Sequence, residues 1–165
     1  MRPFRRRGNE LVARLVDAEA GIVGLLLDQL DQLLAADPAD SGGDPVMGRL
    51  LPPGHASDPE IAADYRDLTE AGLRSGKADD LATVRATLPP DGGEVRLDED
   101  QARAWLRTTN DLRLALGTRL GVTAETEPPE DPTDEEGSQL AVYYWLTAVQ
   151  GSLVDALVAG RGGRT

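Results

Sequence analysis

The stretch that most constrains the fold is Leu140–Ala159, LAVYYWLTAVQGSLVDALVA, because it is apolar along most of its length. Its apolar residues recur every three or four positions on two faces, which predicts a helix with more than one apolar stripe. Tyr143, Tyr144 and Trp145 are half of the six aromatic residues. We expect a central core helix surrounded by three or more helices. A homodimer through its edge, or through a helix at 18–36, is the weaker expectation.

The same stretch is not predicted to cross a membrane. A span needs about 20 strongly apolar residues, and here Thr147, Gln150, Ser152 and Asp155 interrupt the run. The 165-residue chain contains no cysteine, which excludes a disulfide, a thiolate metal site and a thiol redox switch. We therefore expect one cytoplasmic domain over residues 1–160.

Residues 3–15 predict a β-hairpin, with Gly8 and Asn9 as a two-residue turn that has glycine first. A lone hairpin is marginally stable in water. It must therefore pack on helices or pair with a third strand, for which residues 94–97 are the candidate.

The hairpin register predicts which side chains share a face. Arg5, Arg7 and Arg14 lie on the outward face with Glu10, whereas Arg6 falls on the apolar face, against the alternation. We expect Arg5, Arg7 and Arg14 to contact a protein partner.

Apolar periodicity and capping residues predict a mostly α fold, a helical bundle with a small N-terminal β-hairpin. Asp98 is a predicted helix cap, and Gly21 and Gly24 are expected to permit close approach of helices. The predicted helices are 18–36, 59–68, 70–88, 98–120 and 134–159, with loops at 37–57 and 121–133 and a flexible tail at 161–165. The predicted core residues are Leu26, Leu30, Trp105, Leu112, Leu116, Tyr144, Trp145 and Leu153.

The loop at 37–57 is rich in Pro, Gly and Asp but contains an apolar group, Met47, Leu50 and Leu51. These side chains either cover the edge of the core or form an exposed contact patch. The second alternative makes them protein-interaction residues.

Charge is distributed unevenly along the chain. The formal net charge is −12, but residues 1–14 contain five arginines and one glutamate and carry +4, which leaves −16 for the remainder. Acidic balance opposes nucleic acid, because neutralisation of phosphates supplies most non-specific affinity. A basic edge on an acidic body is better suited to docking on a charged protein surface.

No pattern indicates catalytic, metal or cofactor chemistry. His55 is the only histidine, and the acidic runs at 98–100 and 134–136 lie at predicted helix starts, where carboxylates favour the helix dipole. The glycine pairs at 42–43 and 92–93 are not followed by Lys-Ser or Lys-Thr, so they are turns rather than phosphate loops. We expect a protein that is not an enzyme.

The two longest predicted C-terminal helices resemble those of a known family. The motifs are Val95-x-Leu97-x-x-x-Gln101-Ala102-x-Ala104-Trp105-Leu106, then Asn110-Asp111-x-Arg113-Leu114, and the later Tyr-x-Trp-Leu run. They are similar to an uncharacterised actinobacterial family usually encoded beside the Clp-protease adaptor ClpS, which includes an oxidative-stress transcriptional regulator.

The resemblance implies a regulatory protein-interaction module in transcription or stress, with RNA polymerase or a sigma factor as partner. The alternative is an accessory factor of the Clp proteolysis system. That family's regulator senses oxidation through a cysteine pair, which this chain does not have, so the resemblance transfers no sensing residue.

The charge distribution predicts no specific DNA binding by the isolated chain, because the acidic body repels phosphates and no basic recognition helix is present. Fluorescence anisotropy with promoter fragments at about 150 mM salt checks this. Submicromolar, sequence-dependent binding would contradict it.

Overall fold

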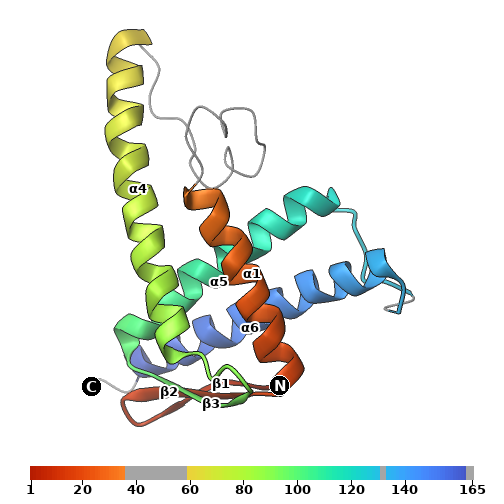
Figure 1. The fold of residues 1–165 in the computed structure, drawn as a ribbon. Helices are drawn as coiled ribbons and strands as arrows, with labels where there is room; N and C mark the ends of the chain where they lie inside the picture. Colours follow the sequence, from red (N-terminus) through yellow and green to blue (C-terminus); the bar gives the residue numbers. More distant parts are fainter. Residues whose placement is uncertain (36–58, 131–132, 163–165) are drawn as a thin grey trace.

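A computed structural model shows helices stacked on one side of a small antiparallel sheet (Figure 1). It describes residues 1–35, 59–130 and 133–162, with 59–71 described by their backbone alone. The elements are β1 Arg2–Arg7, β2 Glu10–Leu15, α1 Asp17–Ala35, α4 Pro59–Thr87, β3 Gly93–Leu97, α5 Glu99–Leu120 and α6 Glu135–Gly162. The predicted fold class, including the third strand, is confirmed.

The sheet has the order β1-β2-β3, with both neighbouring pairs antiparallel. Gly8 begins the hairpin turn at φ 62°, a left-handed conformation that glycine adopts without steric cost. The pairs nearest the turn are Arg5–Val12, Arg6–Leu11 and Arg7–Glu10, as the sequence predicted. The two-residue turn therefore sets the register of the part of the strand pair that adjoins it, from Arg5 to Val12.

One face of this sheet is the floor of the core. Its apolar side chains are at most 5% exposed: Phe4, Leu11, Ala13, Leu15, Val95 and Leu97. Helices α5 and α6 pack against the strands from this side (Figure 1). Alternation of side chains along the strands thus separates a mostly apolar buried face from a mostly charged exposed one.

The central helix is α5, which contacts α1, α4, α6 and the strands β2 and β3. Its start is fixed by a capping box, in which Asp98 accepts from the Gln101 backbone and the Gln101 side chain accepts from Asp98, so the predicted cap is confirmed. Trp105 is 3% exposed and donates its indole N–H to Thr87 Oγ1 at 2.7 Å. Its ring meets Phe4 edge to face, with centroids 5.6 Å apart. One side chain of α5 therefore contacts both the sheet and α4.

The expectation that α6 is the central helix is wrong. Among the described elements its close neighbours are α5 and the strands β1 and β2, rather than three or more helices. Ser152, Ala156 and Gly160 of α6 face β1, whereas Val154 and Val158 in the same stretch are 41% and 59% exposed on another side of the helix. Among the described residues, no helix combines the length and apolarity that crossing a membrane requires.

The predicted core residues occupy two environments. Four are at most 4% exposed: Leu30, Trp105, Leu112 and Leu153. Three are partly buried against that core: Leu26, Leu116 and Trp145. Tyr144 is also partly buried, and its hydroxyl donates to the Thr126 carbonyl at 2.8 Å. It therefore ties the loop that follows α5 to α6.

A single helix, α4, replaces the two helices predicted at 59–68 and 70–88. Its attachment to α5 is partly polar, because Lys77 Nζ contacts both carboxylate oxygens of Asp111 at 2.9 Å. Burial raises the pKa of Asp111, and the hydrogen bond from Lys77 opposes that rise. Around Lys77 an ion pair to α5 takes the place of apolar contacts. The apolar periodicity of the sequence is therefore interrupted there, although the helix continues.

Three glycines differ from what the sequence suggested. A Cβ built at Gly21 or Gly24 meets nothing within 4 Å, so the interpretation that they permit close helix approach is wrong. Gly160 follows the end of the helix predicted at 134–159 but lies inside α6. A Cβ there would overlap the Arg6 guanidinium, so Gly160 leaves the space in which Arg6 lies.

Two substitutions in α6 should therefore have opposite effects. Gly160→Ala should lower the free energy of unfolding by about 1–3 kcal/mol, because it displaces the Arg6 guanidinium from Glu99 and from the Ala156 carbonyl, which are partly buried contacts. Gly151→Ala should raise it by roughly 0.5–1 kcal/mol, because its Cβ meets nothing within 4 Å and alanine favours the helix. Urea unfolding measures both. A Gly160→Ala variant as stable as the parent would contradict this packing.

Candidate protein-interaction surface

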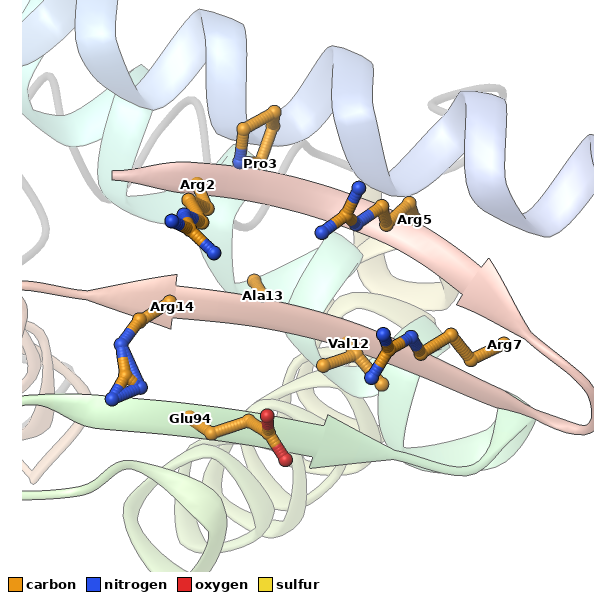
Figure 2. A pocket seen from close by; sticks show the side chains of 8 residues that line it. All are labelled: Arg2, Pro3, Arg5, Arg7, Val12, Ala13, Arg14 and Glu94. Atoms are coloured by element: carbon orange, nitrogen blue, oxygen red, sulfur yellow. The ribbon is translucent and has the colours of Figure 1, made fainter.

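The outer face of the sheet carries a hollow of about 420 Å³ (Figure 2). It is lined by Arg2, Pro3, Arg5, Arg7, Val12, Ala13, Arg14 and Glu94. We call the four exposed arginines Arg2, Arg5, Arg7 and Arg14 the arginine face. Val12 is 7% exposed at its floor, so a small apolar floor lies among guanidinium groups.

Strand geometry explains how the four arginines meet. Arg5 and Arg7 point to the same side of β1 because side chains alternate along a strand, and Arg14 points to that side from β2. Between Arg2 and Arg5 the register shifts by one residue, so Arg2 pairs with Arg14. This irregularity adds a fourth arginine that regular alternation would have placed elsewhere.

The other charges on the sheet are already paired. Arg96 on β3 forms an ion pair with Glu10 at 3.0 Å and another with Glu94. The hydrogen bond from Arg96 lowers the pKa of Glu94, and the charges of Arg7 and Arg14 act in the same direction. Glu94 therefore stays ionised and is occupied by Arg96.

Among the described residues, the arginine face has no hydrogen-bonded partner of this kind, although Arg14 is the cross-strand partner of Glu94 and the charges of Arg7 and Arg14 lower the pKa of that carboxyl. In the described part of the chain, the side chains of Arg2, Arg5, Arg7 and Arg14 make neither a hydrogen bond nor an ion pair. Arg2 and Arg14 are directly opposite each other, and like charges in that position destabilise a strand pair. Glu94, opposite Arg14 on the other side and already paired with Arg96, offsets this repulsion only in part, and a bound anion would reduce it further.

Arg6 points the other way and fixes the strand beneath this surface. Its Nη2 contacts Glu99 Oε1 at 3.0 Å, and its Nε donates to the Ala156 carbonyl at 3.1 Å. The Phe4 amide also donates to Ser152 Oγ at 3.3 Å. Arg6, which breaks the alternation of the strand, therefore attaches β1 to the start of α5 and to the C-terminal part of α6.

The chemistry of this surface suits the binding of anions and not the transfer of protons. Arginine stays protonated at any physiological pH, so it can neither accept nor release a proton as a catalyst would. It offers fixed donors that match carboxylate and phosphate oxygens. In the described residues, no three His, Cys, Asp or Glu side chains are placed to hold a metal ion.

The structure unites some predicted site residues and leaves others out. Arg5, Arg7 and Arg14 lie together, as their shared face predicted. Met47, Leu50 and Leu51, the other predicted contacts, fall outside the described residues, as does His55. Sequence reasoning missed Arg2. A proline inside a strand marks an edge or a bulge, so Pro3 was the signal available.

Comparison with known proteins gives a consistent family assignment. The family model described as Domain of unknown function (DUF2017) matches residues 1–157. Proteins named Oxidative stress regulator AosR, from Mycobacterium tuberculosis and Mycobacterium bovis, are 32% identical over 81% of this chain and 68% of their own length. A Mycobacterium leprae relative is 33% identical over 90% of this chain and 79% of its own. No solved structure matches significantly.

Like-charge repulsion on the arginine face should be measurable as instability. Arg14→Thr should raise the melting temperature at low salt, because it removes the charge opposite Arg2 and keeps a residue suited to strands. The gain should shrink at about 1 M salt, because the screening length falls to about 3 Å and the repulsion between the two arginines is then weak. Arg85→Thr is the control, since Arg85 pairs with Asp28 at 2.7 Å and its loss should not stabilise the fold. A fall in melting temperature for Arg14→Thr would contradict the unpaired state of this face.

Proposed function

The chain belongs to the DUF2017 family, and we propose that it is a regulatory protein that binds a protein partner through the arginine face. Its relatives are named as oxidative stress regulators, which supports a regulatory role rather than an enzymatic one. We place that role in transcriptional or stress regulation. The partner class we propose is RNA polymerase or a sigma factor.

The observation that carries the proposal is the set of four guanidinium groups that have neither a hydrogen bond nor an ion pair within the described part of the structure. They lie on a strand pair whose opposite face is fixed to helices α5 and α6. Arg6 and Phe4 attach β1 to α5 and α6 by hydrogen bonds. The arginines therefore start from an ordered backbone, and less freedom is lost when a partner binds. Arginine is also enriched where proteins meet.

An acidic protein surface suits this face better than nucleic acid. The chain as a whole carries −12, so a long polyanion lying across the sheet would soon meet repulsive surface. A compact acidic segment can contact the arginine face alone, because charges beyond about 8 Å are screened at physiological salt. We therefore propose that the partner contributes carboxylates to the hollow and a small apolar group over Val12.

Any response of this chain to oxidation must work without thiols, since it contains no cysteine. A signal could instead reach it through the partner, whose abundance or exposure of an acidic segment sets how much complex forms. The binding surface of this chain then stays unchanged on oxidation, and the partner carries the change.

Capture from native lysate of the source cells tests the proposal. The immobilised chain should retain RNA polymerase or a sigma factor, identified by mass spectrometry, and Arg5→Glu/Arg7→Glu should retain at least about tenfold less. The matched control is Arg119→Glu/Arg161→Glu, which changes two arginines on helices and gives the same net charge of −16. It should bind like the parent.

Two results would contradict the proposal. One is equal loss of the partner in both variants, which would indicate a general charge effect. The other is capture that neither variant changes, which would place the binding site elsewhere. Retention of ClpS or Clp subunits, lost only in Arg5→Glu/Arg7→Glu, would keep the docking face but replace the partner class.

A further inference from the structure

A second charged feature lies at the other end of the molecule from the arginine face. Between Arg119 and Arg161 the chain contains no lysine or arginine. Five described carboxylates there are exposed, and none has a hydrogen-bond or ion-pair partner among the described residues: Glu125, Glu127, Glu130, Glu135 and Glu136. We call these five residues the acidic end.

Hydrogen bonds fix the turn at Thr123–Thr126, where the acidic end begins. Thr123 accepts the Thr126 amide at 3.1 Å through its carbonyl, and its own amide donates to Thr126 Oγ1 at 2.8 Å. The Tyr144 hydroxyl holds the Thr126 carbonyl at 2.8 Å and ties this turn to α6. The turn therefore projects from the far end of α5 and α6, away from the sheet (Figure 1).

Within one molecule the two features do not meet, but between two copies they can. Glu125, Glu127 and Glu130 flank two prolines, which keep that segment stiff and reduce the freedom lost on binding. Four unpaired guanidinium groups on one copy match a run of unpaired carboxylates on another. We propose that the arginine face of one molecule binds the acidic end of a second copy, head to tail.

This contact gives the docking face a built-in competitor. A second copy bound to the arginine face excludes an acidic partner from it. Regulation of partner binding in this way rests on the proposed function, whereas the self-association itself does not. Because the two surfaces differ, the contact is heterologous and leaves a free arginine face at one end of each assembly. Partner binding and assembly length then oppose each other.

The net charge of −12 works against association, so the attraction must come from local contact. At about 150 mM salt the screening length is about 8 Å, which preserves charge pairs in contact and weakens repulsion between distant parts of two molecules. The association is accordingly weak and sensitive to salt.

Sedimentation velocity of the parent and two charge-reversed variants tests the contact. At about 50 mM salt, the average mass of the parent should rise with concentration above the 17.6 kDa of one chain. It should return to one chain at about 1 M salt. Arg5→Glu/Arg7→Glu, at −16, and Glu125→Lys/Glu127→Lys/Glu130→Lys, at −6, should each associate at least about tenfold more weakly.

The second variant separates this contact from general repulsion. Its net charge is smaller in magnitude than that of the parent, which would strengthen association if repulsion alone decided the outcome. Loss of the acidic end instead predicts weaker association. Mixing the two variants should restore association, because the reversed face of one then meets the reversed end of the other.

A parent chain that stays at the mass of one chain under all these conditions, or a mixture that does not associate, would overturn the inference. So would self-association that survives either reversal. None of these outcomes affects capture of a partner by the arginine face, so failure here leaves the proposed function standing.

Discussion

The position of Trp105 determines how the sheet sits against the helices. Its ring packs edge to face on Phe4 of β1, and its indole N–H donates to Thr87 near the end of α4. An aromatic pair contributes about 0.5–1.5 kcal/mol beyond its buried area, and truncating a buried tryptophan costs about 3–5 kcal/mol. Three elements far apart in sequence thus depend on one side chain of α5.

The arginine face depends on this arrangement. The sheet buries one apolar face on α5 and α6 and must present the other to solvent or to a partner. Arg6 connects the two sides, because it lies on the strand between Arg5 and Arg7 but bonds to Glu99 and to the Ala156 carbonyl. Unpaired like charges are tolerated on this surface because the core below holds the strands together.

Much of this fold could be predicted from local chemistry. The Gly8-Asn9 turn determines strand register, and Asp98 followed by Gln101 specifies a helix start, because both depend on neighbours in sequence. The central place of α5 could not be predicted, since the apolar run of α6 is longer. Among the described elements α6 packs on α5 and on the sheet rather than among several helices.

The arginine face was predictable in part for the same reason. Arg5, Arg7 and Arg14 follow from alternation alone. Arg2 joins them through a register shift that alternation does not specify and that only Pro3 signals. The role of Arg6 depends on Glu99 and on the space at Gly160, both far away in the chain. Contacts of this kind depend on tertiary packing, which periodicity does not report.

The central claim, that a protein partner docks on the outer face of the sheet, is tested most directly by amide hydrogen exchange of the chain alone and in its captured complex. The account predicts slower exchange in residues 2–15 and 93–97 when the partner is bound, with the exposed surfaces of α1 and α5 unchanged. Slower exchange confined to the helices, with residues 2–15 unaffected, would contradict it.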